Sequence, residues 1–575
     1  MRAVTRALLA LVLLAGVVDA KPRARVKARI AAKATAPRTK APVLPLDVNA
    51  TIAIAGEQRK MKDLVAAKGR LSVEEETAQK IALMLRGPLR NGETGLYVAD
   101  ARTGTPLFAI NADEAFNPAS NVKMISTAAA LELLGPTFRY PTRVLGPSPE
   151  AGVIKGDIFL LGSYDPTLTS ADVVDLAAAI AAKGITRIEG GIVVGPDPTR
   201  DGIYRAMLPI EITAGEPGAP PVAVLPMGAD HVTVTMLAKT AKRALKKPRL
   251  TYKVETTKGP DKRPKIHVTV RGTLGKGATT MYPLSTRERT ATAAYALKAG
   301  LVAHGVTVSG DLEVRELGEF VGDSVGFGTL PEELARHESR PLADIVTRIN
   351  KWSINWLADR VIMTAAALAK RQQPSMELAL EAMYAWLDRH PHIKRSELYV
   401  DTGSGLSYRT RISPAELVKI VRSAAGYAPD SDAALGATWM STLAIAGTDG
   451  TLRHRVRGTD LGARVRGKTG TLSTVIAMSG LLDVDPERPL AFALVTNTKR
   501  PLSKGAVRRA HDQVISALCT YVARTTKVNP LAPPPPAPAV AAPPPPSPTA
   551  EPGAEPDAEE TERDPLLDAE TSAQP

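Results

Sequence analysis

NPASNVKMISTAAALELLG (residues 117–135) places Ser120 and Lys123 three residues apart, where an apolar helical pattern begins. Residues three apart on a helix are neighbours on its surface, so we expect the Lys123 amine beside the Ser120 hydroxyl. A hydroxyl is a weak nucleophile at neutral pH, and a lysine can accept its proton if burial or a second cation lowers the pKa of the amine. Because an N-cap serine followed by a solvated lysine gives the same spacing, this pair alone does not identify a catalytic site.

Two further motifs follow downstream, and their order is far more specific than the pair. The segments KWSINWLAD and RGKTGTLS contain Ser353, Asn355, Lys468, Thr469 and Gly470. The succession Ser-x-x-Lys, Ser-x-Asn and Lys-Thr-Gly is typical of the chemistry of penicillin-binding proteins and serine β-lactamases. The three motifs together therefore predict an enzyme that forms an acyl-serine intermediate.

The two ends of the chain differ in composition from its body. Residues 1–20 begin with basic residues and an apolar run and predict a signal peptide, with an uncleaved anchor as the alternative. Residues 21–70 predict a basic flexible arm, and residues 528–575 predict a Pro-rich acidic disordered tail. Cys519 is the sole cysteine, which excludes an internal disulfide and favours a buried, small apolar role.

The chain has 575 residues, of which 44% are apolar, so we expect two or three globular units. Helical spacing and strand alternation mark residues 71–140 and 326–527, which we predict to be the two parts of one catalytic domain. Residues 141–325 contain strand-like runs such as HVTVTML and KIHVTVRG, with a helix at ADVVDLAAAIAAKG. This middle region predicts one or two inserted β-rich domains.

Several longer segments resemble one protein family. They are NPASNVKMISTAAALELLGPTFRYPT, LLGSYDPTL, GSGLS, AGTDGTLRHRV and VRGKTGTLSTVIAMSGLL. They resemble the exported D-alanyl-D-alanine carboxypeptidases and endopeptidases of the low-molecular-mass class C penicillin-binding proteins, the penicillin-binding protein 4-like peptidase S13 family. The resemblance implies an α/β (α+β) transpeptidase fold like that of serine β-lactamases and DD-peptidases, with an antiparallel sheet flanked by helices and with inserted domains.

The resemblance assigns catalytic roles to four residues. Ser120 would attack the carbonyl of the penultimate D-alanine, and Lys123 would act as its base. Ser353 would relay a proton towards the leaving amine, while Asn355 would bind the substrate and hold Lys123 in place. The oxyanion hole would consist of the backbone N–H groups of Ser120 and Thr471.

The third motif would bind the substrate. Lys468 and Thr469 would hold the terminal carboxylate with a cation and a hydroxyl donor, Gly470 would permit close approach of the backbone, and Thr471 would line the same strand. No metal and no organic cofactor is implied. The implied partners are peptidoglycan stem peptides ending in D-Ala-D-Ala, and β-lactam antibiotics as covalent inhibitors.

Charge and composition bear on where the protein acts. The net charge of +14 favours contact with anionic wall polymers or a membrane surface, whereas 4% aromatic residues argue against nucleic-acid binding. The signal peptide predicts export to the periplasm or to the outer face of the cytoplasmic membrane. The alternatives are a β-lactamase or esterase of the same fold, and a non-catalytic peptidoglycan-binding protein.

Some positions depart from the pattern of the family. Thr402 and Tyr408 flank GSGLS where the family usually has aspartate and arginine, and Asp401 and Arg409 stand one place outside. Two other acidic residues, Asp197 and Asp201, are better explained as surface turn residues than as contacts to a diamino acid of the substrate. His390 and His392 in HPHIKR predict a solvated loop at a helix end rather than a metal site.

Overall fold

The computed structural model describes most of the chain between residues 50 and 526. The described residues are 50–67, 69–194, 207–245, 247–259, 264–284, 289–314, 331–456, 464–499 and 503–526. The expected signal peptide, the tail at 528–575, and Asp197 and Asp201 lie outside them. Within these ranges, no helix has both the length and the apolar character needed to cross a membrane.

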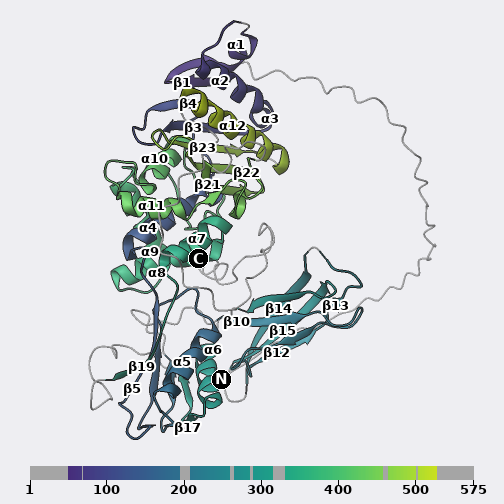
Figure 1. The fold of residues 1–575 in the computed structure, drawn as a ribbon, viewed down its shortest axis with the longest axis vertical. Helices are drawn as coiled ribbons and strands as arrows, with labels where there is room; N and C mark the ends of the chain where they lie inside the picture. The colour runs from purple at the N-terminus through teal and green to yellow at the C-terminus, as the bar shows by residue number, and fades with distance from the viewer. Residues whose placement is uncertain are drawn as a thin grey trace, which may run out of the picture. The chain divides into compact units, whose positions relative to one another are not determined.

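An antiparallel eight-stranded sheet forms the centre of the predicted catalytic domain (Figure 1). From edge to edge its strands are β2 (Glu57–Lys60), β1 (Thr51–Ile54), β4 (Pro106–Ile110), β3 (Glu93–Asp100), β23 (Leu490–Asn497), β22 (Val475–Leu482), β21 (Val465–Leu472) and β20 (Ala444–Ile445). The central strands β22 and β23 are continuous apolar runs that are buried on both faces. Such strands require other elements to pack on both faces of the sheet, because apolar side chains project from each face.

Helices cover both faces of this sheet and enclose two hydrophobic cores. One core includes residues of α4 (Lys123–Leu134), α7 (Leu342–Trp352), α8 (Asn355–Lys370), α9 (Met376–Arg389), α10 (Pro414–Ala424) and α11 (Ala433–Ser441). The other includes residues of α1 (Met61–Ala66), α2 (Val73–Met84) and α12 (Lys504–Thr525), and α3 (Arg86–Asn91) contacts the same layer. Within the first core, α4 is buried at every position from Lys123 to Leu131. A helix that is apolar all round belongs in an interior, so Lys123 enters the core with it.

The inserted region has two cores of its own. The first combines a five-stranded and a three-stranded sheet with two helices: β5 (Pro141–Gly146), β6 (Val153–Ile154), β7 (Ile158–Leu161), α5 (Ser170–Ala182), β8 (Arg187–Ile188), β9 (Ile192–Val194), α6 (Arg289–Ala303), β17 (Thr307–Val308), β18 (Leu312–Val314) and β19 (Glu332–Glu338). The elements of the second core lie between β9 and α6 in the sequence, and all of them are strands. They are β10 (Leu208–Thr213), β11 (Val222–Val224), β12 (Val232–Met236), β13 (Lys239–Thr240), β14 (Arg249–Lys258), β15 (Pro264–Leu274) and β16 (Thr279–Leu284). The expected β-rich character therefore fits the second core, whereas α5 and α6 make the first a mixed α/β layer.

Two predicted boundaries differ from the structure. The sequence predicts a basic arm over residues 21–70, but residues 51–66 form β1, β2 and α1, and β1 pairs with β4 of the central sheet. Ile52 and Met61 are fully buried there, and the burial of these apolar side chains favours folding of the segment despite the basic residues around them. The inserted region was expected to end at 325, but β19 (Glu332–Glu338) pairs with β5 in its sheet. The sequence of this strand, EELARHE, is mostly charged and lacks the alternating apolar pattern that predicts a strand.

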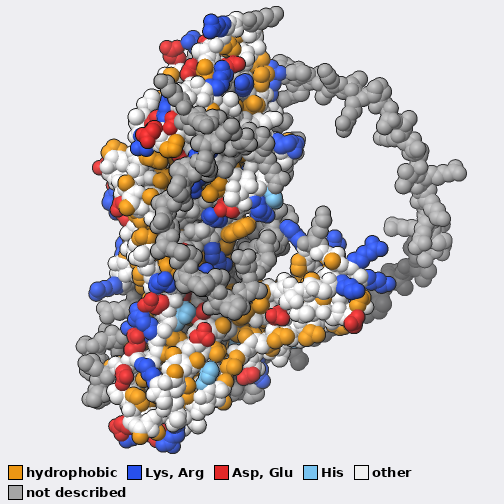
Figure 2. Space-filling view, viewed as in Figure 1, with side chains coloured by type: hydrophobic (Ala, Val, Ile, Leu, Met, Phe, Trp, Pro, Cys, Tyr) orange, Lys and Arg blue, Asp and Glu red, His pale blue; other side chains and the backbone are white. Residues whose placement is uncertain are grey.

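The sheet of β12 to β15, with its connecting loops, is strongly basic; we call residues 232–276 the basic sheet. Blue side chains gather over it in Figure 2. Its exposed cations are Lys239, Lys242, Arg243, Lys247, Arg249, Lys253, Lys258, Lys265, Arg271 and Lys276. Among the described residues of this range, Glu255 is the one acidic residue, and it pairs with Lys253 at 2.8 Å.

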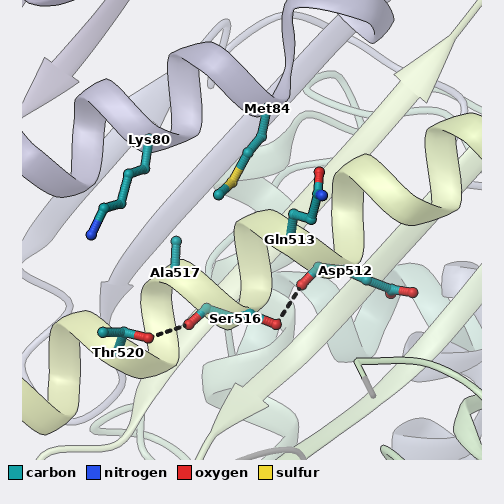
Figure 3. Close-up of a pocket in the computed structure, with 7 residues that line it drawn as sticks. All are labelled: Lys80, Met84, Asp512, Gln513, Ser516, Ala517 and Thr520. Carbon is teal, nitrogen blue, oxygen red and sulfur yellow. Dashed lines mark hydrogen bonds between the residues drawn. The ribbon is translucent and has the colours of Figure 1, made fainter. Parts of the chain in front are cut away.

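A surface pocket of about 280 Å³ lies between α2 and α12 (Figure 3). Its lining residues are Lys80, Met84, Asp512, Gln513, Ser516, Ala517 and Thr520. None of the residues predicted for catalysis lines it, so we assign it no role in the chemistry.

Candidate active site

Ser120 and Lys123 lie where a short 3-10 turn becomes a helix. The turn η1 (Ala119–Val122) runs directly into α4, whose first residue is Lys123. The Lys123 Nζ atom donates a hydrogen bond to Ser120 Oγ at 3.0 Å. Ala119 has a φ of +47°, a left-handed conformation that costs a non-glycine residue about 1 to 2 kcal/mol. The strained residue directly precedes the half-buried Ser120, so strain is stored next to the predicted nucleophile.

The amine of Lys123 is fully buried and is held by two further acceptors. Nζ donates to Asn355 Oδ1 at 2.7 Å and to the carbonyl oxygen of Ser404 at 2.7 Å. Burial lowers the pKa of Lys123 to about 7, although the charge of Asp359 acts in the opposite direction. Burial likewise raises the pKa of Asp359, so both groups are shifted towards their neutral forms. In its neutral form the amine keeps two N–H donors, for Asn355 Oδ1 and the Ser404 carbonyl, and its lone pair can accept the hydroxyl proton of Ser120 across the 3.0 Å contact, as a general base does.

A second buried lysine is paired with the second serine. Lys468 Nζ, on β21, donates to Ser353 Oγ at 2.7 Å and to the carbonyl oxygen of Thr469 at 2.9 Å. Burial lowers the pKa of Lys468 well below its usual range, and the positive charge of Lys123 lowers it further. Ser353 is the C-cap of α7 and has a φ of +61°, so the residue that contacts Lys468 has a left-handed conformation at a helix end.

β21 packs directly against the turn that carries Ser120, and Gly470 makes this possible. A Cβ atom at Gly470 would lie 2.4 Å from the carbonyl oxygen of Pro118 and 3.2 Å from Cβ of Ala119. β20 pairs with β21 only up to Gly467. Among the described residues, no strand covers the outer edge of β21 beyond that point, so an extended peptide can pair there.

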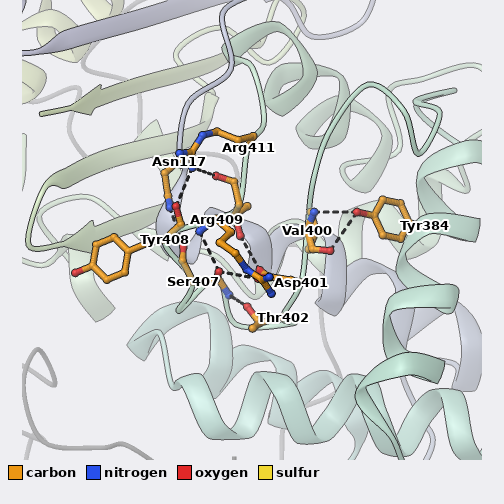
Figure 4. A network of polar contacts seen from close by, with 11 residues as sticks. Asn117, Tyr384, Val400, Asp401, Thr402, Ser407, Tyr408, Arg409 and Arg411 are labelled. Atoms are coloured by element: carbon orange, nitrogen blue, oxygen red, sulfur yellow. Dashed lines mark hydrogen bonds and ion pairs between the residues drawn. The ribbon is translucent and has the colours of Figure 1, made fainter. Parts of the chain in front are cut away.

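The loop 401–411, whose polar contacts Figure 4 shows, supplies an acceptor for Lys123. Ser404 supplies the carbonyl that binds Nζ, and its own N–H donates to Asp359 Oδ1 at 2.7 Å. Gly405 has a φ of +75°, and a Cβ there would lie 2.1 Å from the carbonyl oxygen of Ala119. The Ser404 carbonyl, which accepts from Lys123, is thus held in place by Asp359 on one side and by the close approach of Gly405 to the backbone of Ala119 on the other.

The positions that depart from the family are joined to one another within this loop. Asp401 accepts hydrogen bonds from Ser407 Oγ at 2.8 Å and from Arg409 Nε at 3.0 Å, and Figure 4 shows these groups converging. The hydroxyl of Thr402 accepts from the N–H of Gly405 at 3.0 Å. Tyr408 projects away from these contacts and its hydroxyl lies 2.8 Å from Ser473 Oγ. Asp401 and Arg409, one place outside the usual flanking positions, therefore pair with each other and brace the loop.

Asn117 clamps η1, the turn that carries the predicted nucleophile Ser120 and that we call the nucleophile turn. Asn117 was not singled out from the sequence. Its Oδ1 accepts from the N–H of Ala119 at 2.8 Å, and its Nδ2 donates to the carbonyl of Ser407 at 2.7 Å. Asn497 on β23 completes the clamp, accepting from the N–H of Asn117 at 2.7 Å. The turn is thereby tied to the sheet and to the loop at once.

The structure brings the predicted motif residues together. Hydrogen bonds join Ser120, Lys123 and Asn355 in one group, and Ser353 and Lys468 in another. Thr469 Oγ1 lies 2.9 Å from Thr451 Oγ1 in η2 (Gly450–Leu452), a contact not foreseen. Asp359 was also missed, although a signal existed: it follows Asn355 by four residues, which places both on one face of α8.

Two carboxylates contact the histidine loop. His390 Nε2 lies 2.6 Å from Glu132 Oε2, and His392 Nε2 lies 2.8 Å from Asp430 Oδ2. His390 is mostly shielded, so the expectation of a solvated loop is wrong for His390 and holds for His392, which is 66% exposed. In the part of the chain that the structure describes, no group of three or more His, Cys, Asp or Glu side chains could hold a metal ion.

Comparison with known proteins gives consistent matches. Residues 77–518 match the model of the D-Ala-D-Ala carboxypeptidase 3 (S13) family. The chain is 28% identical over 477 residues to a D-alanyl-D-alanine carboxypeptidase of Actinomadura sp. (strain R39), covering 73% of this chain and 81% of that protein. It is 26% identical over 456 residues to carboxypeptidase DacB of Mycolicibacterium smegmatis, covering 76% and 84%.

One solved structure tests the fold. Penicillin binding protein 4 from Haemophilus influenzae aligns with a TM-score of 0.57 and 20% identity, covering 78% of this chain and 99% of that one. The expected α/β fold of the DD-peptidase type, with an antiparallel sheet between helices, is therefore confirmed.

Proposed function

The chain belongs to the D-Ala-D-Ala carboxypeptidase 3 (S13) family of serine-type carboxypeptidases, and we propose that Ser120 is its nucleophile, acting on peptidoglycan stem peptides. The observation that carries this assignment is the 3.0 Å hydrogen bond between Lys123 Nζ and Ser120 Oγ at a fully buried amine. Burial favours the neutral amine, which is the form that can accept a proton. Ser120 therefore has its base in place before the substrate arrives.

Acylation follows from this arrangement. Ser120 Oγ attacks the carbonyl carbon of the penultimate D-alanine while Lys123 takes the hydroxyl proton. An ester bond forms to Oγ, and the C–N bond to the terminal residue breaks. Since Lys468 Nζ donates to Ser353 Oγ at 2.7 Å, the hydroxyl proton of Ser353 is left to protonate the leaving amine. Ser353 then takes up the proton that Lys123 received from Ser120, so both groups are neutral again. Water then hydrolyses the ester and releases the shortened peptide.

Stabilisation of the oxyanion is assigned to the backbone N–H groups of Ser120 and Thr471. The close packing of Gly470 on Pro118 supports this role, because it brings β21 next to the nucleophile turn. One such donor is typically worth about 10²- to 10³-fold in rate. A β-lactam presents a strained amide to the same groups and is expected to remain attached to Ser120 as an acyl-enzyme.

The same chemistry extends to crosslinks. In a crosslinked stem peptide, the amine that leaves belongs to a second peptide rather than to free D-alanine. The open edge of β21 supports DD-endopeptidase as well as carboxypeptidase activity, because an extended chain can continue along it. We propose that both substrates are cleaved, at the periplasm or the outer face of the cytoplasmic membrane.

The basic sheet supports the proposed contact with anionic wall polymers. Its cations are exposed and outnumber its acidic residues, so their potentials add over one surface. The variant Lys247→Gln/Arg249→Gln/Lys253→Gln is expected to sediment less with purified cell walls than the wild type, and salt should weaken the wild-type binding. Equal sedimentation of both proteins would contradict this contact. Binding to anionic lipid vesicles but not to walls would assign the surface to a membrane instead.

Release of D-alanine tests the proposed activity. Wild-type protein and Ser120→Ala are incubated with an acyl-D-Ala-D-Ala peptide and with crosslinked muropeptides, and the products are separated by chromatography. The wild type is expected to release D-alanine and to split the crosslinks, and Ser120→Ala to do neither. Hydrolysis of penicillin without peptide cleavage would indicate a β-lactamase. Wall binding without turnover of either reagent would indicate a non-catalytic protein.

A further inference from the structure

Ser353 has a left-handed backbone, and the two residues before it contact one short segment of the chain. Its φ is +61°, and a non-glycine residue keeps such a conformation only when its surroundings enforce it. The segment consists of η2 and the residue on each side of it, and we call residues 449–453 the η2 brace. Because the brace contacts Lys351 and Trp352 at the end of α7, it lies where it can enforce the conformation of Ser353.

Lys351 is held through both its side chain and its backbone. Its Nζ atom pairs with Asp449 Oδ2, and the two side chains are 22% and 29% exposed. An ion pair that is shielded to this degree is screened less by salt than a pair on the open surface. Gly450 has a φ of +52°, and a Cβ atom there would lie 2.4 Å from the carbonyl oxygen of Lys351. The backbone of the η2 brace therefore needs a glycine to approach the end of α7 so closely.

Trp352 and the strand β21 contact the remaining residues of the η2 brace. The guanidinium of Arg453 lies 5.4 Å from the centre of the Trp352 ring, within the range of a cation–π interaction. Thr451 Oγ1 accepts a hydrogen bond from Thr469 Oγ1 of β21 at 2.9 Å. The brace thus joins the end of α7, where Ser353 lies, to the strand that carries Lys468.

We propose that the η2 brace, through the ion pair of Asp449 with Lys351, positions Ser353 against Lys468 for transfer of a proton to the leaving amine. This rests on the proposed function, in which Ser353 protonates that amine while Lys468 donates to its Oγ at 2.7 Å. The two groups come from different elements, so a fixed link between α7 and β21 keeps the distance between them constant. Asp449 and Lys351 are positioning residues, and their effect is confined to the departure of the leaving group.

The test compares two substrates whose leaving groups differ in their need for a proton. An acyl-D-Ala-D-Ala peptide releases an amine, which must be protonated as the C–N bond breaks, whereas the matching thioester releases a thiolate, which can leave without a proton. The ratio kcat/KM is measured with both substrates for wild type, Asp449→Asn, Lys351→Met and Ser353→Ala. Loss of the ion pair is expected to lower kcat/KM for the peptide by about 10-fold, part of the 10²- to 10⁴-fold that a positioned proton donor supplies. The value for the thioester should change by less than about threefold.

Lys370→Met provides a matched control. Lys370 Nζ pairs with Glu381 at 2.6 Å and lies at the C-terminal end of α8, whereas Ser353 lies just before the N-terminal end of that helix. The same change of side chain and charge should therefore leave both kcat/KM values at the wild-type level. Lys351→Arg keeps a cation that can pair with Asp449 and should recover part of the activity towards the peptide.

The outcomes separate the role of the brace from the proposed function. Normal turnover of the thioester by a variant shows that its active site is folded, so a loss confined to the peptide supports the positioning role. An equal loss with both substrates, or no loss with the peptide, in Asp449→Asn and Lys351→Met would overturn that role and leave Ser120 as the nucleophile. A wild-type protein that cleaves neither substrate, or a Ser353→Ala protein that loses both activities equally, would contradict the proposed function, and the role of the brace would fail with it.

Discussion

Gly470→Ala tests whether the contact between β21 and the nucleophile turn sets the rate. The added Cβ would lie 2.4 Å from the carbonyl oxygen of Pro118 and 2.8 Å from Nδ2 of Asn121. Ordinary contact begins at 3.4 Å, so the turn and the strand must separate by about 1 Å. The atoms that block the new methyl group belong partly to backbone, and backbone cannot rotate away as the end of a long side chain can.

The size of the effect follows from that displacement. Ser120 lies two residues beyond Pro118, and Thr471 follows Gly470, so the nucleophile and the proposed oxyanion donor move apart together. A misplacement of about 1 Å at a catalytic centre costs roughly 10²-fold in rate, or about 2.7 kcal/mol in activation free energy. We therefore expect the second-order rate of acylation by a fluorescent penicillin to fall by about 10²-fold.

A matched glycine provides the control for stability. At Gly87 in α3, an added Cβ would meet nothing within 4 Å, so Gly87→Ala should fold and react like the wild type. Thermal unfolding of both variants would show that Gly470→Ala is still folded at the assay temperature. If a folded Gly470→Ala protein is acylated at the wild-type rate, the reasoning about close approach is refuted.

Three further predictions concern the base. Lys123→Met keeps the length of the side chain but removes the amine, so the protein should remain folded and lose acylation by roughly 10²- to 10⁴-fold; normal labelling by fluorescent penicillin would exclude Lys123 as the base. Because the neutral amine is the active form and burial lowers its pKa to about 7, the acylation rate should rise with pH and reach half its plateau near pH 7; a rate that falls across this range would contradict the assignment. Since the charge of Asp359 raises the pKa of Lys123, Asp359→Asn should move the half-rise to lower pH, and a shift to higher pH would count against the coupling.

The order of the motifs was sufficient to predict which residues meet. Ser120, Ser353 and Lys468 lie far apart in the chain, yet each motif carries a residue whose chemistry makes sense only beside the others. The resemblance that these motifs carry implied the fold class, which the structure confirms.

The contacts that position these residues could not be read in the same way. Asn117, Ser404 and Thr451 act through hydrogen bonds whose partners are set by tertiary packing, and their residue types are common in any loop. β19 was not predicted because its sequence is mostly charged and has no alternating apolar pattern, so only its pairing with β5 identifies it as a strand.

The central claim is that Ser120 becomes acylated by the action of its buried lysine. It is tested most directly by mass spectrometry of the wild-type protein and Ser120→Ala after incubation with benzylpenicillin, with the adduct mapped to a peptide. A mass increase of one benzylpenicillin on the peptide that contains Ser120, absent from Ser120→Ala, is the predicted result. A folded wild-type protein that carries no adduct, or an adduct that persists in Ser120→Ala, would contradict the account.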